Sequence, residues 1–143
     1  MQRSLIVLPL AAVLLALAAV PAGSATKTLF PANCGKPTYK PTRIVVACGD
    51  ANNRLARIKW ESYGTDSASG TAIAVVNDCD PNCVQGEFHR FHAVVTLNRA
   101  KDCGRYMQFT RLVERFTGEK PDSTSSKVTV RFPCVSYLPR ING

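Results

Sequence analysis

Two short runs of residues have the types and spacing that metal binding requires. In Cys79-x3-Cys83-x5-His89-x2-His92, two thiols and two imidazoles follow one another closely, and zinc takes four such ligands in a tetrahedron. The spacing fits no common zinc module, however. Residues three apart on a strand point to opposite faces, so we expect that His89 and His92 do not share an ion. The sequence therefore predicts no metal site and no cofactor.

The second run, Asp78-x-Asp80-x-Asn82, resembles the start of a calcium-binding loop. An EF-hand loop also needs a glycine at its sharp turn and a distant bidentate glutamate. Both are missing here, and two cysteines interrupt the pattern. We expect a solvated acidic turn at this position.

A third set of residues has the types that hydrolysis of a phosphate ester requires. A small microbial ribonuclease uses a carboxylate base, a histidine acid and arginines that hold the phosphate. In this chain Glu87, His89 and Arg90 stand together, and no histidine follows His92, although the acid histidine of such ribonucleases lies well downstream of the base. A ribonuclease-like hydrolase is therefore our alternative to a non-enzymatic function. It would use Glu87, His89 and the arginines Arg105, Arg111 and Arg115.

The N-terminal stretch 1–25 has the three parts of a secretory signal. A single positive charge is followed by an aliphatic run from Leu5 to Val20 and then by small residues. The run is shorter than the roughly 20 residues that cross a bilayer. We expect cleavage after Ala25, with Ala22 as the other candidate position, and no transmembrane segment in the mature chain. The chain is therefore predicted to be secreted.

All six cysteines follow that stretch. An even number of cysteines in a small exported chain is typical of a domain stabilised by disulfides. Many pairings are open in principle, but proximity along the chain suggests three of them. These are Cys34–Cys48, Cys79–Cys83 and Cys103–Cys134.

Alternation of apolar and polar residues predicts strands. Along 55–62, Ala56, Ile58 and Trp60 are expected on one inward face. The charged residues between them are expected on the other face: Arg57, Lys59 and Glu61. Further strands are predicted over 43–48, 71–77, 87–97 and 127–132.

The stretch 105–117 is compatible with two structures. Phe109, Leu112, Val113 and Phe116 have helical spacing, whereas the residue types favour a strand. With strands on both sides, we expect a strand with a bulge. The fold class is then all-β, a small disulfide-stabilised antiparallel β-sandwich or barrel of about six strands. Residues 26–42 are expected as an extended lead-in, and 43–143 as a single β domain.

The net charge of +8 favours anionic partners. Alternation places one basic patch at Arg54, Arg57 and Lys59, and a second one at Lys101, Arg105, Arg111 and Arg115. Proteins that read nucleic acids usually expose aromatic side chains for stacking, and most aromatic residues here fall on inward faces, so the nucleic-acid signal is weak. The candidate partners are an anionic polymer of the cell envelope or another protein.

Distinctive polar residues gather in two turns that flank the predicted strands. The loop 78–86, closed by two nearby cysteines, is rigid enough to present residues to a partner at small entropic cost. The candidate ligand-binding residues are Asp50, Asn52, Trp60, Asp78, Asp80 and Asn82. The chain is thus expected to be a secreted binding or interaction module.

Two motifs are similar to those of a known group. The C-G-D-x-N turn at 48–52 and the C-x-P-x-C-x-x-G loop at 79–86 resemble small exported actinobacterial proteins. The resemblance covers roughly Pro41 to Gly86, with a weaker tail through Phe109. It implies secretion and a β fold, and it implies no catalytic residues.

Overall fold

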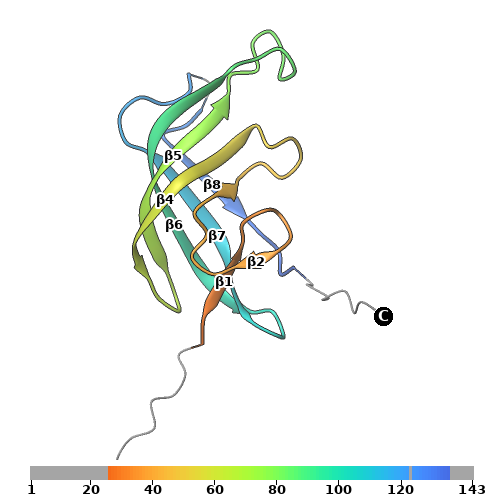
Figure 1. The fold of residues 1–143 in the computed structure, drawn as a ribbon, viewed down its shortest axis with the longest axis vertical. Coiled ribbons are helices and arrows are strands. Elements are labelled where there is room, and N and C mark those ends of the chain that lie inside the picture. Colours follow the sequence, from red (N-terminus) through yellow and green to blue (C-terminus); the bar gives the residue numbers. More distant parts are fainter. Residues whose placement is uncertain (1–25, 123, 136–143) are drawn as a thin grey trace, which may run out of the picture.

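The computed structural model describes residues 26–122 and 124–135 (Figure 1), so the predicted signal at 1–25 lies outside the described residues. None of the described residues forms a helix that is long and apolar enough to cross a membrane. The chain folds into eight strands. They are β1 (Thr28–Pro31), β2 (Pro37–Thr38), β3 (Ile44–Val45), β4 (Asn53–Tyr63), β5 (Ala68–Asn77), β6 (Phe88–Asp102), β7 (Met107–Phe116) and β8 (Lys127–Arg131).

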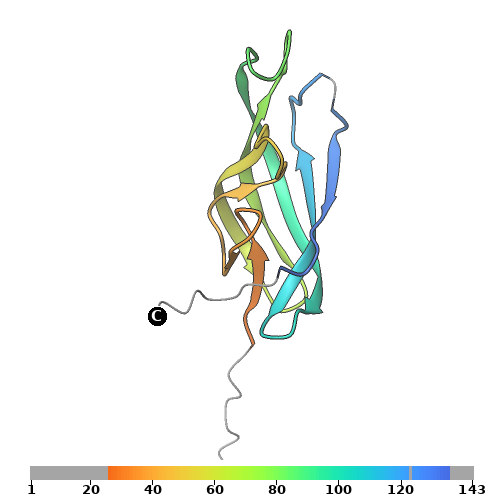
Figure 2. The same cartoon turned by 90° about the vertical axis from the view of Figure 1, so that its right-hand side faces the viewer.

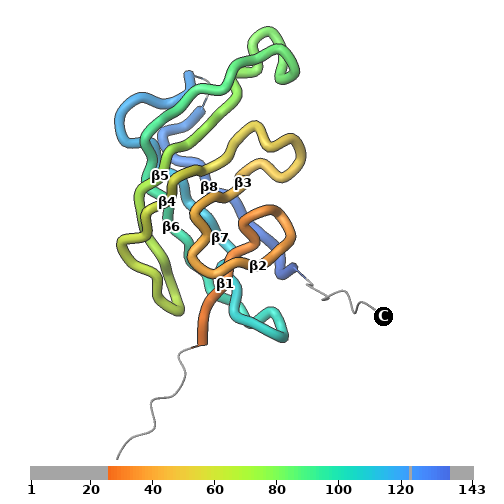
Figure 3. Tube along the Cα trace, viewed as in Figure 1, coloured from red at the N-terminus to blue at the C-terminus, as the bar shows by residue number. Residues whose placement is uncertain are grey.

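The strands form one strongly curled sheet, a half-barrel (Figure 2). Its order is β2-β1-β7-β6-β5-β4-β3, and β8 also pairs with β7. All pairings are antiparallel except the short one between β1 and β7. β3, labelled in Figure 3, pairs with β4 at the other edge. The all-β, disulfide-stabilised fold class is therefore confirmed.

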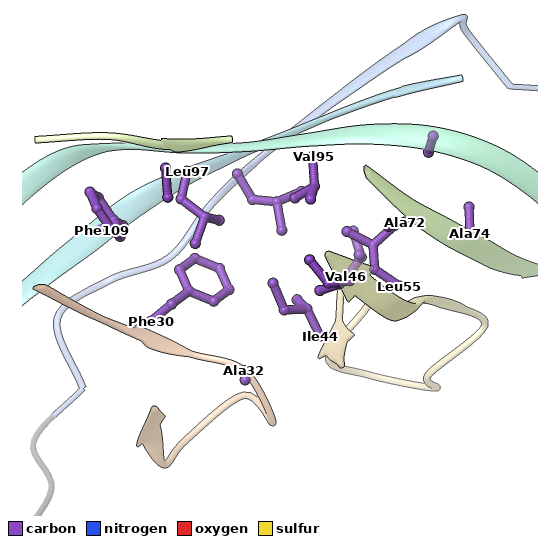
Figure 4. Packing of buried hydrophobic residues seen from close by; sticks show 14 of the residues in the cluster. Phe30, Ala32, Ile44, Val46, Leu55, Ala72, Ala74, Val95, Leu97 and Phe109 are labelled. Carbon is purple, nitrogen blue, oxygen red and sulfur yellow. The ribbon is translucent and has the colours of Figure 1, made fainter. Parts of the chain in front are cut away.

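The core lies on the concave side of the sheet, under the N-terminal segment. Phe30 of β1 and Ile44 of β3 are fully buried and face Leu97 and Val95 of the long strand β6 (Figure 4). Phe132 joins them after β8, with its ring edge-on to Phe30 at 4.8 Å. Burial of such side chains contributes roughly 1.5–3 kcal/mol each. We call the opposite side of β4–β8, which is turned away from this core, the outer face.

The expected number of six strands is too low. The two additional strands, β1 and β2, come from the segment 26–42. Pro31 and Pro37 lack a backbone N–H, and a proline in a sequence argues against a central strand. Both prolines lie in the short pair β1–β2, where Pro31 is opposite Pro37 and few N–H groups are needed.

The stretch 105–117 is a strand, as expected, and forms β7. Its register with β6 is constant from Ala93↔Phe116 to Asp102↔Met107, so the bulge expected there is absent. Phe109 and Leu112 are nevertheless both fully buried. These two residues lie three positions apart and would face opposite sides of a regular strand. They share the core side because the alternation of β6 and that of β7 both reverse near Arg99, which has a φ of 55°.

A bulge does occur in β4, which the alternation did not predict. The register with β5 shifts between Ala56↔Ile73 and Lys59↔Thr71, and Arg57 between them has a φ of 53°. The extra residue reverses the alternation. Ile58 and Trp60 pack toward the core as expected, but Ala56 lies on the outer face, where it lines a groove. The expectation for Ala56 is wrong for that reason.

All six cysteines lie within the described residues, and they form three disulfides. The pairs are those suggested by proximity: Cys34–Cys48, Cys79–Cys83 and Cys103–Cys134. Cys103–Cys134 joins the turn after β6 to the segment after β8, across 31 residues of chain. Closing a loop of that length is worth about 3–4 kcal/mol in the chain-entropy model.

Candidate functional site

The loop 78–86 lies at one end of the sheet, beyond β5 and β6 (green, upper end of Figure 1). Its polar side chains bond mostly to its own backbone. Asn82 Oδ1 accepts from the N–H groups of Val84 and Gln85, and Asn77 Oδ1 accepts from that of Cys79. The disulfide between Cys79 and Cys83 closes the same ring and withdraws both sulfurs from metal binding.

Asp78 is the centre of this network. Its Oδ2 lies 2.8 Å from His89 Nε2, and its Oδ1 accepts from the backbone N–H groups of Asp80 and Glu87. The hydrogen bond from His89, followed by those from the two backbone groups, holds the pKa of the Asp78 carboxyl below its ordinary value. Glu87, the base of the hydrolase alternative, is exposed, and His89 pairs with Asp78 instead.

The turn at Asp50 and Asn52 lies beside this loop, because the backbone N–H of Asn77 donates to the carbonyl of Asn52. Asp50 accepts from both the backbone and the side-chain amide of Asn52, at 3.0 and 2.8 Å. The backbone hydrogen bond is the main reason that the pKa of Asp50 is lowered. The fold thus places Asn52, with Asp50 in the same turn, beside the base of the loop that carries Asp78, Asp80 and Asn82.

Trp60 is the exception among the predicted ligand residues. It lies in the other half of β4, opposite Gly70, and packs edge-on against Tyr63 with ring centroids 5.0 Å apart. Its indole N–H donates to the carbonyl of Pro41 at 2.9 Å. Trp60 therefore packs at the edge of the core. A ligand site at the other five predicted residues stays a prediction.

A cleft of about 730 Å³ separates the loop 78–86 from the β7–β8 connection. Carboxylates from both sides line it, with Asp78 and Asp80 facing Glu119 and Asp122, and His89 lies in its wall. Within residues 26–122 and 124–135, no group of three or more histidine, cysteine or carboxylate side chains is arranged to hold a metal ion. We call this cleft, with the loop 78–86 and the turn at Asp50 and Asn52, the acidic end.

The outer face is basic instead. Cross-strand pairing aligns its side chains in rows across neighbouring strands. One row runs Arg54, Val75, Arg90; the next runs Lys59, Thr71, Val94, Arg115, Lys127; a third runs Asn98, Arg111, Arg131. On β7 and β8, Arg115 therefore stands directly opposite Lys127, and Arg111 opposite Arg131.

Two grooves lie on the outer face, toward its two ends. The first has a volume of about 290 Å³ and is lined by Arg57, Arg90 and His92 above Ile73, Val75 and Phe91. The second has a volume of about 470 Å³, and Arg99, Lys101 and Arg131 line it beside Phe132 and Pro133. Neither groove is lined by a carboxylate. We call them the β4–β6 groove and the β6–β8 groove.

The basic residues of the outer face have no acidic partners. Among the described residues, the one ion pair joins His89 to Asp78. The strands contribute three carboxylates: Glu114 is buried on the core side, Asp102 ends β6 in a turn, and Glu61 lies near the end of β4. His89 and His92, three residues apart on β6, lie at the acidic cleft and at the outer groove respectively, as the strand geometry predicts.

Comparison with protein-family models, with curated proteins and with solved structures found no match for this chain. The resemblance to exported actinobacterial proteins therefore stays a prediction.

Sequence reasoning found part of the outer face. It predicted Arg54, Arg57 and Lys59 as one patch and assigned Arg111 and Arg115 to another, whereas the register joins both patches into one face. It missed the residues that complete the grooves: Arg90, Arg99 and Arg131. Only knowledge of strand order would have added them, since Arg131 lies beside Arg111 through the β7–β8 pairing.

Proposed function

We propose that this protein is an exported binding module that holds a phosphate-bearing, anionic polymer of the cell envelope on its outer face. The observation that carries the proposal is the row of unpaired cations across β4–β8. Its sharpest part is the pair of like-charged contacts between β7 and β8, where Arg115 opposes Lys127 and Arg111 opposes Arg131.

Such contacts do not stabilise the isolated fold. Like charges directly opposite one another on two strands destabilise their pairing, and no carboxylate within the described residues neutralises them. An external polyanion removes the repulsion and is attracted by the whole row. The outer face is therefore better suited to a bound polymer than to bare solvent.

The chemistry of the face favours a polyol-phosphate polymer over a nucleic acid. Guanidinium groups bind phosphate through paired N–H donors, and the outer face carries arginines in every row. The residues between the cations are small and uncharged, such as Thr71 and Val94. They suit a polyol chain, whereas base stacking needs exposed aromatic rings. Phe88 is the large aromatic exposed beside this face, and the Arg54 guanidinium covers its ring at 4.4 Å.

Binding of poly(glycerol phosphate) to the oxidised protein, measured by calorimetry at several salt concentrations, tests the proposal. We expect affinity to fall steeply with salt, because binding releases or screens small ions around each phosphate. A triple variant, Lys59→Gln with Arg115→Gln and Lys127→Gln, removes the central row. It should lower the affinity by about tenfold or more, since hydrogen bonds to charged groups contribute about 1.5–3 kcal/mol each.

The matched control removes the same charge from the other side of the molecule. Lys27→Gln with Lys36→Gln and Arg43→Gln changes exposed residues of the N-terminal segment, none of which lies in β4–β8. Equal losses in the two triple variants would show that net charge alone drives binding and would overturn the proposed face. Tighter binding of single-stranded DNA than of poly(glycerol phosphate) would overturn the assignment of the polymer.

A further inference from the structure

We infer that Arg57 and Arg99 are paired anchor residues, which hold two phosphates of one polymer chain in the β4–β6 groove and the β6–β8 groove. The inference rests on the proposed function and adds to it the positions that carry most of the affinity.

Both arginines adopt a left-handed conformation that their residue type disfavours. Their φ angles are 53° and 55°, a region that costs a residue with a Cβ about 1–2 kcal/mol and that glycine enters freely. Local folding at these positions would therefore favour glycine. A backbone outlier kept at such a cost points to a role outside the fold.

The left-handed residue changes what the outer face presents. In a regular strand, alternate residues share a face, but the bulge at Arg57 places Ala56 and Arg57 consecutively on the outer side, and both line the β4–β6 groove. At Arg99 the two strands change side together, so that Arg99 and Lys101 line the β6–β8 groove while Ala100 packs toward the core. Each irregularity thus directs an arginine into a groove.

Each groove then holds three basic side chains from two strands that flank a third. In the β4–β6 groove, Arg57 of β4 faces Arg90 and His92 of β6 across the apolar floor of β5. In the β6–β8 groove, Arg99 and Lys101 of β6 face Arg131 of β8. In each groove three convergent donors lie next to apolar side chains, Ile73 and Val75 in the first and Phe132 and Pro133 in the second. This combination suits one phosphate with a short aliphatic segment on each side.

The two grooves are too far apart for one small ligand. Arg90 of the first groove and Arg99 of the second lie nine positions apart on β6. Since a strand rises roughly 3.3 Å per residue, the two grooves are separated by up to about 30 Å. A long polymer reaches both, and its second contact is then intramolecular. A polymer shorter than this span occupies one groove at a time.

Lys40 provides a matched control for both arginines. It is also basic, exposed and left-handed, with a φ of 47°. It lies outside the outer face, and its ammonium group sits over the rings of Tyr39 and Tyr63, at 5.6 and 5.9 Å from their centroids. Replacing Lys40 by glycine removes one charge and one strained residue, as do the same substitutions at Arg57 and Arg99.

The test measures binding of long and short poly(glycerol phosphate) to Arg57→Gly, Arg99→Gly, their combination and Lys40→Gly, with urea unfolding of each. Since glycine suits a left-handed backbone, we expect the arginine variants to unfold at the same or a higher urea concentration than the wild type. Each arginine variant should lose about tenfold or more in affinity for the long polymer, and Lys40→Gly less than about threefold. The wild type should prefer the long polymer by about tenfold or more, and the double variant should lose that preference.

The outcomes separate this inference from the proposed function. If the wild type binds the polymer but the arginine variants match Lys40→Gly, the anchor role is wrong and the outer face still stands. If the double variant still binds the long polymer more tightly than the short one, the inference that one polymer chain occupies both grooves is also wrong. If the wild type does not bind poly(glycerol phosphate), both proposals fall.

Discussion

At the acidic end, Asp78 accepts hydrogen bonds from His89 and from two backbone N–H groups of its own loop. On the outer face, the cations Arg115 and Lys127 oppose one another, and no carboxylate among the described residues pairs with either. The polar side chains of the acidic end thus fold a loop, whereas those of the outer face leave charge unsatisfied. The two regions differ because folding uses the polar groups of the acidic end, whereas on the outer face Arg115 and Lys127 have no acidic partner among the described residues.

The turn at Asp50 and the loop 78–86 differ from the basic rows of the outer face in what makes their residues stand out. Asp50, Asp78 and Asn82 attract attention in the sequence because they stand in unusual turns. Asp50 bonds to Asn52, and Asn82 bonds to Val84 and Gln85, so that their unusual spacing serves the turns themselves. Most of the basic residues lie in regular strands, and the register brings them onto one face.

The substitution Gly70→Ala has the largest expected effect. It tests whether polymer binding depends on the position of β4 in the outer face. A Cβ at Gly70 would overlap the carbonyl oxygen of Lys59 and lie 2.9 Å from the Cα of Trp60, both of which belong to the backbone of β4. We expect a loss of about 3 kcal/mol in the free energy of unfolding, together with weaker polymer binding, because the bulge at Arg57 moves. Urea unfolding and calorimetry check both. Full stability and full binding would show that β4 adapts to the added methyl group.

Gly86→Ala tests the acidic end in the same way, with a smaller effect. Its Cβ would overlap the side-chain oxygen of Asn77 and lie 2.7 Å from Asp78 Oδ1 and from the backbone nitrogen of Cys79. Side chains yield more easily than a paired strand, so we expect a loss of about 1–2 kcal/mol. Polymer binding should stay unchanged. A drop in affinity as large as that of Gly70→Ala would contradict the separation of the two regions.

Glu114→Gln has the smallest expected effect. It tests how the buried carboxylate on the core side of β7 changes the free energy of unfolding with pH. Burial raises the pKa of Glu114, although a hydrogen bond from Asn53 at 2.9 Å partly offsets the shift. A raised folded-state pKa gives stability that is present below the ordinary value of 4.5 and lost as pH rises through the folded value. The wild type should therefore be less stable at neutral than at mildly acidic pH.

The glutamine variant should lack that pH dependence. Its amide also offers a donor where Asn53 Oδ1 and Glu114 Oε1 have no partner among the described residues. The expected gain at neutral pH is on the order of 1 kcal/mol, the net contribution of one added hydrogen bond. Unfolding curves at pH 4 and pH 7 measure it, and polymer affinity serves as the control, because Glu114 lies behind the outer face. A variant whose stability still falls between pH 4 and pH 7 would assign the pH dependence to another group.

Local patterns were sufficient for most strands and for the disulfides. Alternation in 87–97 predicted β6 because every second residue in the middle of the strand is buried, at Ala93, Val95 and Leu97. Proximity along the chain suggested the pairs Cys79–Cys83 and Cys103–Cys134 among several open pairings, and the structure has both. The strands β1 and β2 were missed, because prolines obscure a short pair whose stability comes from burying Phe30.

The sequence by itself determined that this chain is basic, rich in strands and supplied with an even number of cysteines, because charge, alternation and cysteine count are read directly along the chain. The tertiary structure decided which cations share a surface. Arg54 and Arg131 are far apart in sequence, yet the strand order places both on the outer face. It also decided the left-handed backbone of Arg57 and Arg99, since only pairing with neighbouring strands offsets the cost of that conformation. Register and strain are set by contacts between distant segments, and no local pattern encodes them.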